Sequence, residues 1–143
     1  MGDHRILLVE DNADDVVLTL RALKEHGIAN AIDVASDGAQ AVDYLFGDDG
    51  HPAPELILLD LKLPRMDGLA VLARIRSTER TRLVPVVILT ASALDRDIAD
   101  GYANGANSYV QKPVDFDEFS AAVRQLGLYW LVLNELPPKE ESR

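Results

Sequence analysis

The sequence contains no cysteine, and this absence excludes disulfide bonds, thiolate metal sites and cysteine nucleophiles. Basic residues are also scarce, with 14 Lys and Arg against 24 Asp and Glu, a formal net charge of −10. Such an excess of negative charge disfavours binding to nucleic acid or to an anionic membrane. No apolar run is long enough to cross a bilayer, and the N-terminus has no apolar signal region. We therefore expect a cytoplasmic protein.

The length of 143 residues, of which 48% are hydrophobic, fits one ordinary domain with a core of normal size. There is no internal repeat, low-complexity tract or linker that would divide the chain. We expect residues 1–127 to form the domain and residues 128–143 to form a C-terminal extension. The last residues of that extension have the composition of a disordered tail.

Five short apolar runs alternate with helical patterns along the chain. Three of the runs are nearly continuous Val, Ile and Leu, which is typical of parallel strands buried on both faces. The predicted strands cover residues 6–9, 32–35, 56–59, 84–89 and 108–110. The predicted helices lie between residues 12 and 27, over 40–46, from about 69 to 76, over 95–104 and from 115 onward. This alternation predicts an α/β fold, a doubly wound parallel sheet with helices on both faces.

Polar side chains follow the carboxyl ends of four predicted strands, where open α/β sheets bind their ligands. These residues are Glu10, Asp11, Asp60, Thr90 and Lys112. Converging carboxylates repel one another, and Mg²⁺ accepts such oxygen ligands while it keeps several waters. The lysine and the threonine would add a fixed positive charge and a hydroxyl donor. Together the five residues predict a place that neutralises a phosphoryl group and leaves one carboxylate as nucleophile.

Each of these residues also has an ordinary structural interpretation when it is taken alone. An acidic residue after a strand is often a helix cap or a solvated loop residue. Thr90 could bond its own backbone at the strand end, and Lys112 could be a solvated lysine. The prediction of a site depends on all five falling at the same edge of the sheet.

The segments around these residues resemble the receiver domain of two-component response regulators. The similarity runs from about residue 5 to residue 126, and it is carried by residues 8–12, 58–68, 89–92 and 109–113. The resemblance implies a flavodoxin-like fold, a five-stranded parallel sheet of order 2-1-3-4-5 with five helices. It also implies a stand-alone response regulator that accepts a phosphoryl group from a sensor histidine kinase and is not itself an enzyme.

The resemblance assigns a role to each site residue. It implies that Asp60 is the phosphoacceptor and that Thr90 and Lys112 bond the phosphoryl group. It further implies a Mg²⁺ ion held by the side chains of Glu10, Asp11 and Asp60 and by the backbone carbonyl of Lys62. Tyr109 matches the switch aromatic, and an ordinary half-buried strand aromatic is also compatible with that position. The Lys112–Pro113 bond matches one that is cis in the family.

Two positions beside the site make the lifetime of the phosphate hard to predict. Lys62 lies two residues after Asp60, where the family often has a shorter polar or an apolar residue, and Ser92 lies two residues after Thr90. Both side chains border the path by which water would reach the phosphoryl group. The histidines His4, His26 and His51 are scattered, and we expect all three on the surface.

Three other functions are open on the sequence. An aspartyl-phosphate hydrolase is disfavoured because Asp60 is followed by Leu61 and Lys62 where an Asp-x-Asp pattern is expected. A nucleotide-dependent reductase is disfavoured because the first strand is followed by acidic residues and not by a Gly-rich turn. A receiver that is never phosphorylated is disfavoured by the complete acidic set.

The C-terminal extension suggests the partners of the chain. Residues 128–131 resemble the ending of small receivers paired with phytochrome-type kinases. The stretch from Leu128 to Leu136 is apolar on most sides, so we expect a homodimer through the last helix and this arm. The alternative is an arm that folds back on its own domain. With no DNA-binding segment in the sequence, we expect the output to be a protein contact.

Overall fold

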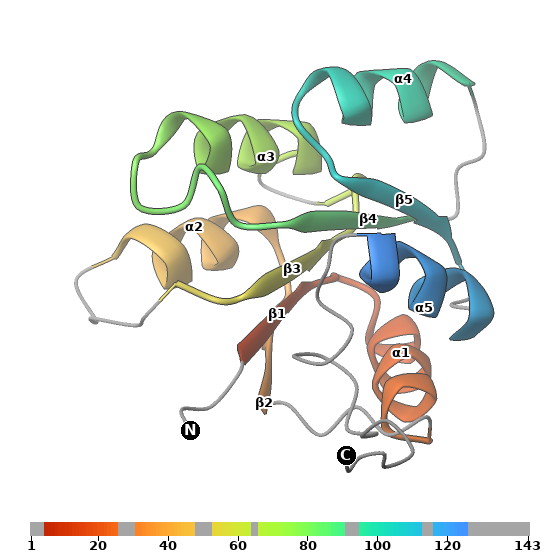
Figure 1. Ribbon diagram of the computed structural model, residues 1–143. Helices are drawn as coiled ribbons and strands as arrows, with labels where there is room; N and C mark the ends of the chain where they lie inside the picture. The colour runs from red at the N-terminus through yellow and green to blue at the C-terminus, as the bar shows by residue number, and fades with distance from the viewer. Residues whose placement is uncertain are drawn as a thin grey trace, which may run out of the picture.

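The structure is a computed structural model that describes residues 5–25, 31–47, 53–63, 66–90, 95–112 and 116–125, and every structural statement below concerns these residues. Five parallel strands form one sheet in the order β2-β1-β3-β4-β5 (Figure 1). The strands are β1 (Arg5–Val9), β2 (Ala31–Ala35), β3 (Leu56–Leu59), β4 (Val86–Thr90) and β5 (Ser108–Gln111). The helices are α1 (Ala13–Glu25), α2 (Gly38–Phe46), α3 (Gly68–Ser77), α4 (Asp95–Ala103) and α5 (Phe116–Gln125). The predicted doubly wound α/β fold and its strand order are confirmed.

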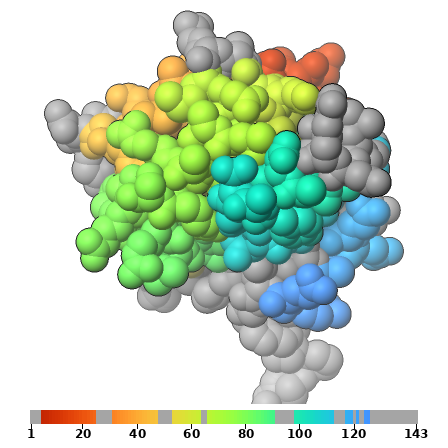
Figure 2. Space-filling model, turned by 90° about the horizontal axis from the view of Figure 1, so that it is seen from above, coloured from red at the N-terminus to blue at the C-terminus, as the bar shows by residue number. Residues whose placement is uncertain are grey.

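Helices cover both faces of the sheet, which explains why the strands are apolar on both sides. On one face, α1 and α5 pack against the sheet through Leu23 and Phe119. On the other face, α2 and α3 pack against it through Leu45 and Leu72, and α4 continues this layer (Figure 1). Figure 2 looks onto this second face and shows the green atoms of α3 between the orange atoms of α2 and the teal atoms of α4. Successive residues of a strand point to opposite faces, so each strand contributes to both cores.

The register of the strands aligns their carboxyl ends. Val9 at the end of β1 pairs with Leu59 at the end of β3, so the residues that follow both strands lie side by side. Thr90 at the end of β4 pairs with Gln111 at the end of β5. The residues predicted to form a site therefore emerge from one edge of the sheet.

Short polar side chains begin three of the helices. Asn12 Oδ1 accepts a 3.0 Å hydrogen bond from the N–H of Asp15, which confirms Asn12 as the predicted cap of α1. Asp37 caps α2 by accepting from the N–H of Gln40 at 2.8 Å, and Asp67 caps α3. These caps satisfy N–H groups that the first turn of a helix leaves unpaired.

Two predicted boundaries are wrong by two residues, because α2 begins at Gly38 and not at Gln40, and β4 begins at Val86 and not at Val84. Pro85 has no N–H to donate to a strand ladder. The backbone of Val84 is used elsewhere, since its N–H donates to Thr81 and its carbonyl accepts a 2.6 Å hydrogen bond from Arg76. The apolar character of Val84 therefore does not show that it belongs to β4.

Several predictions lie outside the described residues. These are the boundary at residue 127, the extension over residues 128–143, the Lys112–Pro113 bond, Ser92 and the three histidines. Among the helices that the structure describes, none is long and apolar enough to cross a membrane.

Candidate functional site

Two buried carboxylates lie side by side where β1 and β3 end. The N–H of Asp60 donates to the carbonyl of Val9 at 3.0 Å, and the N–H of Glu10 donates to the carbonyl of Ala35 at 2.9 Å. Both bonds extend the sheet by one residue and fix the two backbones. Glu10 is only 1% exposed and Asp60 only 5%. Buried carboxylates are costly without a compensating positive charge, so this edge of the sheet needs a cation.

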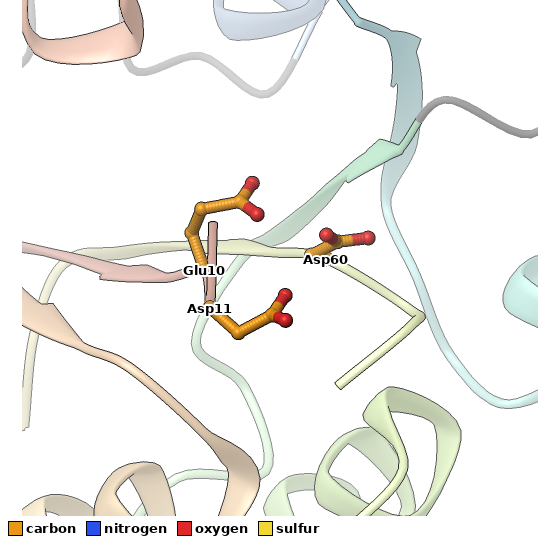
Figure 3. Close-up of side chains that lie close together, drawn as sticks. All are labelled: Glu10, Asp11 and Asp60. Carbon is orange, nitrogen blue, oxygen red and sulfur yellow. The ribbon is translucent and has the colours of Figure 1, made fainter. Parts of the chain in front are cut away.

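A third carboxylate completes a group that fits a divalent cation. Glu10, Asp11 and Asp60 each offer an oxygen atom, and these oxygens all lie within 4.8 Å of one another (Figure 3). Asp11 is exposed while the other two are buried, so the group is open to solvent on one side. An all-oxygen, anionic set with room for water is what hard divalent cations such as Mg²⁺ prefer. The arrangement is that of a divalent metal site.

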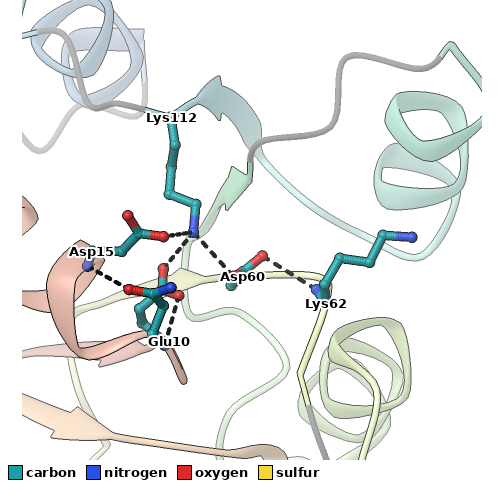
Figure 4. A network of polar contacts seen from close by, with 6 residues as sticks. Glu10, Asp15, Asp60, Lys62 and Lys112 are labelled. Carbon is teal, nitrogen blue, oxygen red and sulfur yellow. Dashed lines mark hydrogen bonds and ion pairs between the residues drawn. The ribbon is translucent and has the colours of Figure 1, made fainter.

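Lys62 contributes to the same site through its backbone. Its N–H donates a 3.2 Å hydrogen bond to Oδ1 of Asp60 and so orients that carboxylate. Its side chain is exposed and extends away from the other charged groups (Figure 4). A metal-ligand role for the carbonyl oxygen of Lys62 stays a prediction.

Lys112 brings one positive charge to the centre of the acidic group. Its Nζ lies 2.8 Å from Oε1 of Glu10, 2.8 Å from Oδ2 of Asp15 and 3.2 Å from Oδ2 of Asp60 (Figure 4). The side chain of Lys112 is only 10% exposed. The ammonium therefore links the residue that follows β5 to α1 and to the residues that follow β1 and β3.

The burial of this group perturbs its proton affinities. Burial raises the pKa of Glu10 to about 7, and repulsion from Asp60 adds to this, although the bond from Lys112 opposes it. Burial also disfavours the charge of Lys112, yet the hydrogen bonds to Asp15 and Glu10 outweigh it and raise the pKa of Lys112 above its ordinary value. Because metal ligation requires the carboxylate form, a cation that binds here must displace any proton on Glu10.

Thr90 ends β4 at the same edge of the sheet as this group, and Tyr109 lies on the neighbouring strand β5. Thr90 is buried at the end of β4, and its carbonyl accepts a 2.8 Å hydrogen bond from the N–H of Lys112. Tyr109 is half-buried on β5, on the sheet face that α4 covers. A Cβ on Gly101 of α4 would lie 2.7 Å from Cδ1 of Ile88 and 3.8 Å from Cδ2 of Tyr109. The absence of a side chain at Gly101 therefore lets α4 approach Ile88 closely, with the ring of Tyr109 beside it.

The sequence interpretation missed Asp15, which binds Lys112 as closely as Glu10 does. A signal for it was present, because Asp15 falls in the first turn of the helix that follows Glu10 and Asp11 in the sequence. The cap at Asn12 predicted where that helix begins. Without the position of the lysine, however, Asp15 could not be told from the exposed Asp14 beside it.

The fold and the site define a class of protein before any relative is considered. It is a flavodoxin-like domain with an acidic metal site, a buried lysine and a threonine at the carboxyl edge of its sheet. Residues 6–124 match the response regulator receiver domain, and the chain belongs to this family.

Two named regulatory proteins are similar in sequence to the chain over nearly all of its length. The probable methanogenesis regulatory protein FilR2 of Methanothrix harundinacea (strain 6Ac) is 42% identical over 134 residues, which cover 92% of this chain and 86% of that protein. The response regulator Rcp1 of Synechocystis sp. (strain ATCC 27184 / PCC 6803 / Kazusa) is 35% identical over 92% of both chains.

Solved structures show the same similarity. The bacteriophytochrome response regulator AtBRR is 43% identical, with a TM-score of 0.83 over 94% of this chain and 100% of that one. The Mn²⁺-bound form of Rcp1 is 34% identical, with a TM-score of 0.73 over 94% of this chain and 99% of that one. Phosphorylation of an aspartate is characteristic of the family, whose receiver domains pair with sensor histidine kinases. Stand-alone members are generally not enzymes.

Proposed function

We propose that the chain is a stand-alone receiver that is phosphorylated on Asp60. The observation that carries this proposal is the position of Oδ2 of Asp60, 3.2 Å from the ammonium of Lys112 and within the group of three carboxylates. Asp60 shares both the positive charge and the cation site, and its backbone is fixed by the sheet. Both features favour a carboxylate that attacks a phosphoryl group in a fixed orientation.

The reaction is a transfer of the phosphoryl group from nitrogen to oxygen. A carboxylate oxygen of Asp60 attacks the phosphorus of a phosphohistidine on the kinase, and an acyl phosphate forms. The P–N bond breaks, and its electron pair stays on the imidazole nitrogen. The ammonium of Lys112 and the hydroxyl of Thr90 would donate hydrogen bonds to the phosphoryl oxygens, which carry the negative charge. The 3.2 Å distance between Nζ of Lys112 and Oδ2 of Asp60 supports this role for the lysine.

We assign the cation site to Mg²⁺, held by Glu10, Asp11, Asp60 and the carbonyl of Lys62. A bound Mg²⁺ supplies charge neutralisation between the carboxylates and the incoming phosphoryl group. The oxygen-only donor set supports this assignment, and Rcp1 has been solved with Mn²⁺, a cation of similar preference.

Phosphorylation is proposed to reach the surface through Thr90 and Tyr109. If the hydroxyl of Thr90 moves toward the phosphoryl group, the space it leaves is open to the ring of Tyr109. The ring of Tyr109 lies beside Gly101 of α4, so a movement of this ring would change its contact with α4. The switching surface would then be the groove of about 380 Å³ between α4, β5 and α5, which Tyr109 lines.

The kinase that delivers the phosphoryl group must reach the edge of the sheet beside α1. Val17 and Leu18 of α1 are 53% and 52% exposed, so this helix offers an apolar contact near the site. We infer a phytochrome-linked kinase, which the similarity to AtBRR and Rcp1 supports. The test is phosphotransfer from a red-light-sensing kinase and from several unrelated kinases. Equal rates from all of them would reject the phytochrome link.

The proposed phosphoacceptor is tested by incubating the full chain with Mg²⁺ and a small phosphodonor and measuring intact mass. We expect the wild-type protein to gain one phosphoryl group and Asp60→Asn to gain none. Asp14→Asn is the matched control, because Asp14 is an exposed aspartate that lies outside the cation site. Phosphate on Asp60→Asn equal to that on the wild type would overturn the assignment.

We also propose a homodimer through α5 and the arm over residues 128–143. The apolar composition from Leu128 to Leu136 supports it, since burying each large side chain contributes about 1.5–3 kcal/mol. The dimer should have two-fold symmetry. Light scattering on the full chain and on a version ending at Gly127 tests both parts. A monomer at full length would reject the dimer, and a dimer that survives truncation would reject the role of the arm.

The output is proposed to be a protein contact and not a nucleic-acid contact. The net charge of −10 supports this, because a phosphate backbone would be repelled.

A further inference from the structure

Asp15 is a carboxylate of the site that lies outside the cation group. It belongs to the first turn of α1, where its N–H is held by Oδ1 of Asn12 at 3.0 Å. Its Oδ2 lies 2.8 Å from Nζ of Lys112, a residue 97 positions away in the sequence. Asp15 is not a member of the metal-binding group of Glu10, Asp11 and Asp60. Its side chain is 35% exposed, so it is the most solvated partner of the lysine.

The three partners of Lys112 match the capacity of its ammonium. An ammonium has three N–H donors, and Lys112 directs bonds to Glu10, Asp15 and Asp60. A divalent cation in the acidic group competes with the ammonium for two of these carboxylates. Two cations near one pair of carboxylates repel each other, so the lysine must withdraw as the divalent cation binds.

We propose that Asp15 is a positioning residue for Lys112, which gives the ammonium a charged partner outside the cation site when Mg²⁺ takes Glu10 and Asp60. The inference rests on the proposed function, since it concerns the same lysine and the same cation. The proposal adds Asp15 to the site, a residue that lies outside the sequence segments that carry the resemblance to the family.

Asp15 acts in this proposal through the lysine and not on the cation itself. Without Asp15, the ammonium has only Glu10 and Asp60 as charged partners, and it competes more strongly with the divalent cation for them. Removal of the Asp15 charge should therefore weaken Mg²⁺ binding. If the ammonium of Lys112 is also removed, Asp15 has no ammonium to draw away from Glu10 and Asp60. Removal of the Asp15 charge should then no longer weaken Mg²⁺ binding through the lysine.

A plain electrostatic effect is the alternative, because any carboxylate near the site attracts a cation. Asp14 provides the matched control for it. Asp14 precedes Asp15 in the same first turn of α1 and is exposed, so both have the same relation to the helix dipole. Within the described residues, Lys112 donates a hydrogen bond to Asp15 but none to Asp14. Asp14→Asn changes the net charge by the same amount as Asp15→Asn.

The experiment is a calorimetric titration of Mg²⁺ into the full chain, without phosphodonor, at one ionic strength. We expect Asp15→Asn to raise the Kd for Mg²⁺ by about threefold to tenfold. Asp14→Asn should change it by about twofold or less. In a Lys112→Met background, Asp15→Asn should have no larger effect than Asp14→Asn has in the wild type. Equal effects of the two aspartates, or an Asp15 effect that persists without the lysine, would overturn the proposal.

A second measurement does not depend on the folding of Lys112→Met. The Cε and Nζ resonances of Lys112 in isotope-labelled protein should shift in Asp15→Asn and stay unchanged in Asp14→Asn. An unshifted lysine in Asp15→Asn would reject the pairing. Because neither readout involves phosphate, a failure here is distinct from a failure of Asp60 as phosphoacceptor, which intact mass alone decides.

Discussion

The N–H of Lys112 donates a 2.8 Å hydrogen bond to the carbonyl oxygen of Thr90, one residue beyond the end of β5. This bond continues the pairing of Thr90 with Gln111 and extends the sheet past its last regular residue. The hydroxyl of Thr90 and the ammonium of Lys112 are therefore carried on one rigid backbone unit. The register of the sheet sets where the hydroxyl and the ammonium lie. Groups that act together on one substrate need such fixed relative positions.

The same dependence on backbone position predicts that Gly68→Ala damages the site. A Cβ at Gly68 would lie 2.4 Å from the carbonyl oxygen of Asp60 and 2.6 Å from Cα of Leu61, so α3 and the loop after β3 must move apart. We expect a loss of about 1–3 kcal/mol in the free energy of unfolding. Because the displaced loop carries Asp60, we also expect phosphorylation to slow by about tenfold or more.

Urea unfolding and the rate of phosphorylation by a small phosphodonor measure the two effects. Ala70→Gly is the control, because Ala70 is exposed on the same helix and its loss costs about 0.5–1 kcal/mol without touching the loop. If Gly68→Ala and Ala70→Gly phosphorylate at the same rate, the close approach at Gly68 does not position Asp60.

Much of this arrangement could be predicted from the sequence because parallel sheets leave strong local signals. The buried run from Leu56 to Leu59 has the bounds of β3, and Asn12 caps α1 as expected. Once the strands are known, the edge of the sheet at which their carboxyl ends lie follows from the topology. The closeness of Glu10, Asp11 and Asp60 was therefore predictable, although the roles of these residues stay predictions.

Contacts between residues distant in the sequence could not be predicted in the same way. The bond between Asp15 and Lys112 depends on which side of the sheet α1 packs and on how far a flexible lysine reaches. The start of β4 depends on Arg76, whose guanidinium takes the carbonyl of Val84. Neither Lys112 nor Arg76 leaves a pattern in the local sequence that predicts these contacts, since lysine and arginine are ordinary surface residue types.

Arg76 supports our second prediction, a large stability cost for its removal. Its guanidinium donates to the carbonyls of Gly105 at 2.9 Å, Val84 at 2.6 Å and Arg82 at 3.1 Å, and to Oδ1 of Asn107 at 2.7 Å. Burial lowers the pKa of Arg76. Its four hydrogen-bond partners are neutral oxygen atoms. Arg76→Met would remove all four bonds and take the side-chain donor from the carbonyls of Gly105 and Val84, while Oδ1 of Asn107 keeps its bond from the N–H of Val86. The loss should lower the free energy of unfolding by about 2–3 kcal/mol.

Arg74→Met on the same helix is the comparison for Arg76→Met. The guanidinium of Arg74 lies 4.7 Å from the centre of the Phe46 ring, and such a contact is worth about 0.5–1 kcal/mol. Chemical unfolding of the two variants gives the difference. If both cost the same, the hydrogen bonds of Arg76 add nothing beyond an ordinary surface contact.

The third prediction is a pH dependence that originates at Tyr44. Burial, with the 2.6 Å hydrogen bond to Asp33, raises the pKa of Tyr44 from 10.0 to about 12. The folded protein therefore keeps a proton that the unfolded chain releases above pH 10.0. The stabilisation is complete below pH 10.0 and is lost as the pH rises toward 12.

Tyr44→Phe isolates this contribution from the other groups that titrate at high pH. We expect the variant to be less stable than the wild type by about 1 kcal/mol at neutral pH. The difference should be constant up to pH 10.0 and should shrink between pH 10.0 and about 12. A difference in the free energy of unfolding that stays the same through this range would show that the phenol does not titrate as described.

The last prediction concerns Lys62 and the lifetime of the proposed acyl phosphate. The N–H of Lys62 holds Oδ1 of Asp60 at 3.2 Å, while its exposed side chain extends on the side away from Lys112 (Figure 4). An ammonium on that side can approach the phosphoryl oxygens from the solvent and obstruct an attacking water. We therefore expect Lys62→Asn to shorten the half-life of the acyl phosphate by about threefold. The yield of phosphorylation should change less, because the backbone bond to Asp60 is kept.

The decay is followed by intact mass after the phosphodonor is removed. Lys24→Asn removes the same charge from an exposed position in the last turn of α1 and is the control for a change in net charge. A specific role requires that decay accelerates in Lys62→Asn and not in Lys24→Asn. Unaltered decay in Lys62→Asn would mean that water reaches the phosphoryl group by a path that this side chain does not border. An initial rate of phosphorylation that falls together with the half-life would instead place Lys62 in the transfer step, because faster decay alone lowers the final yield but not the initial rate.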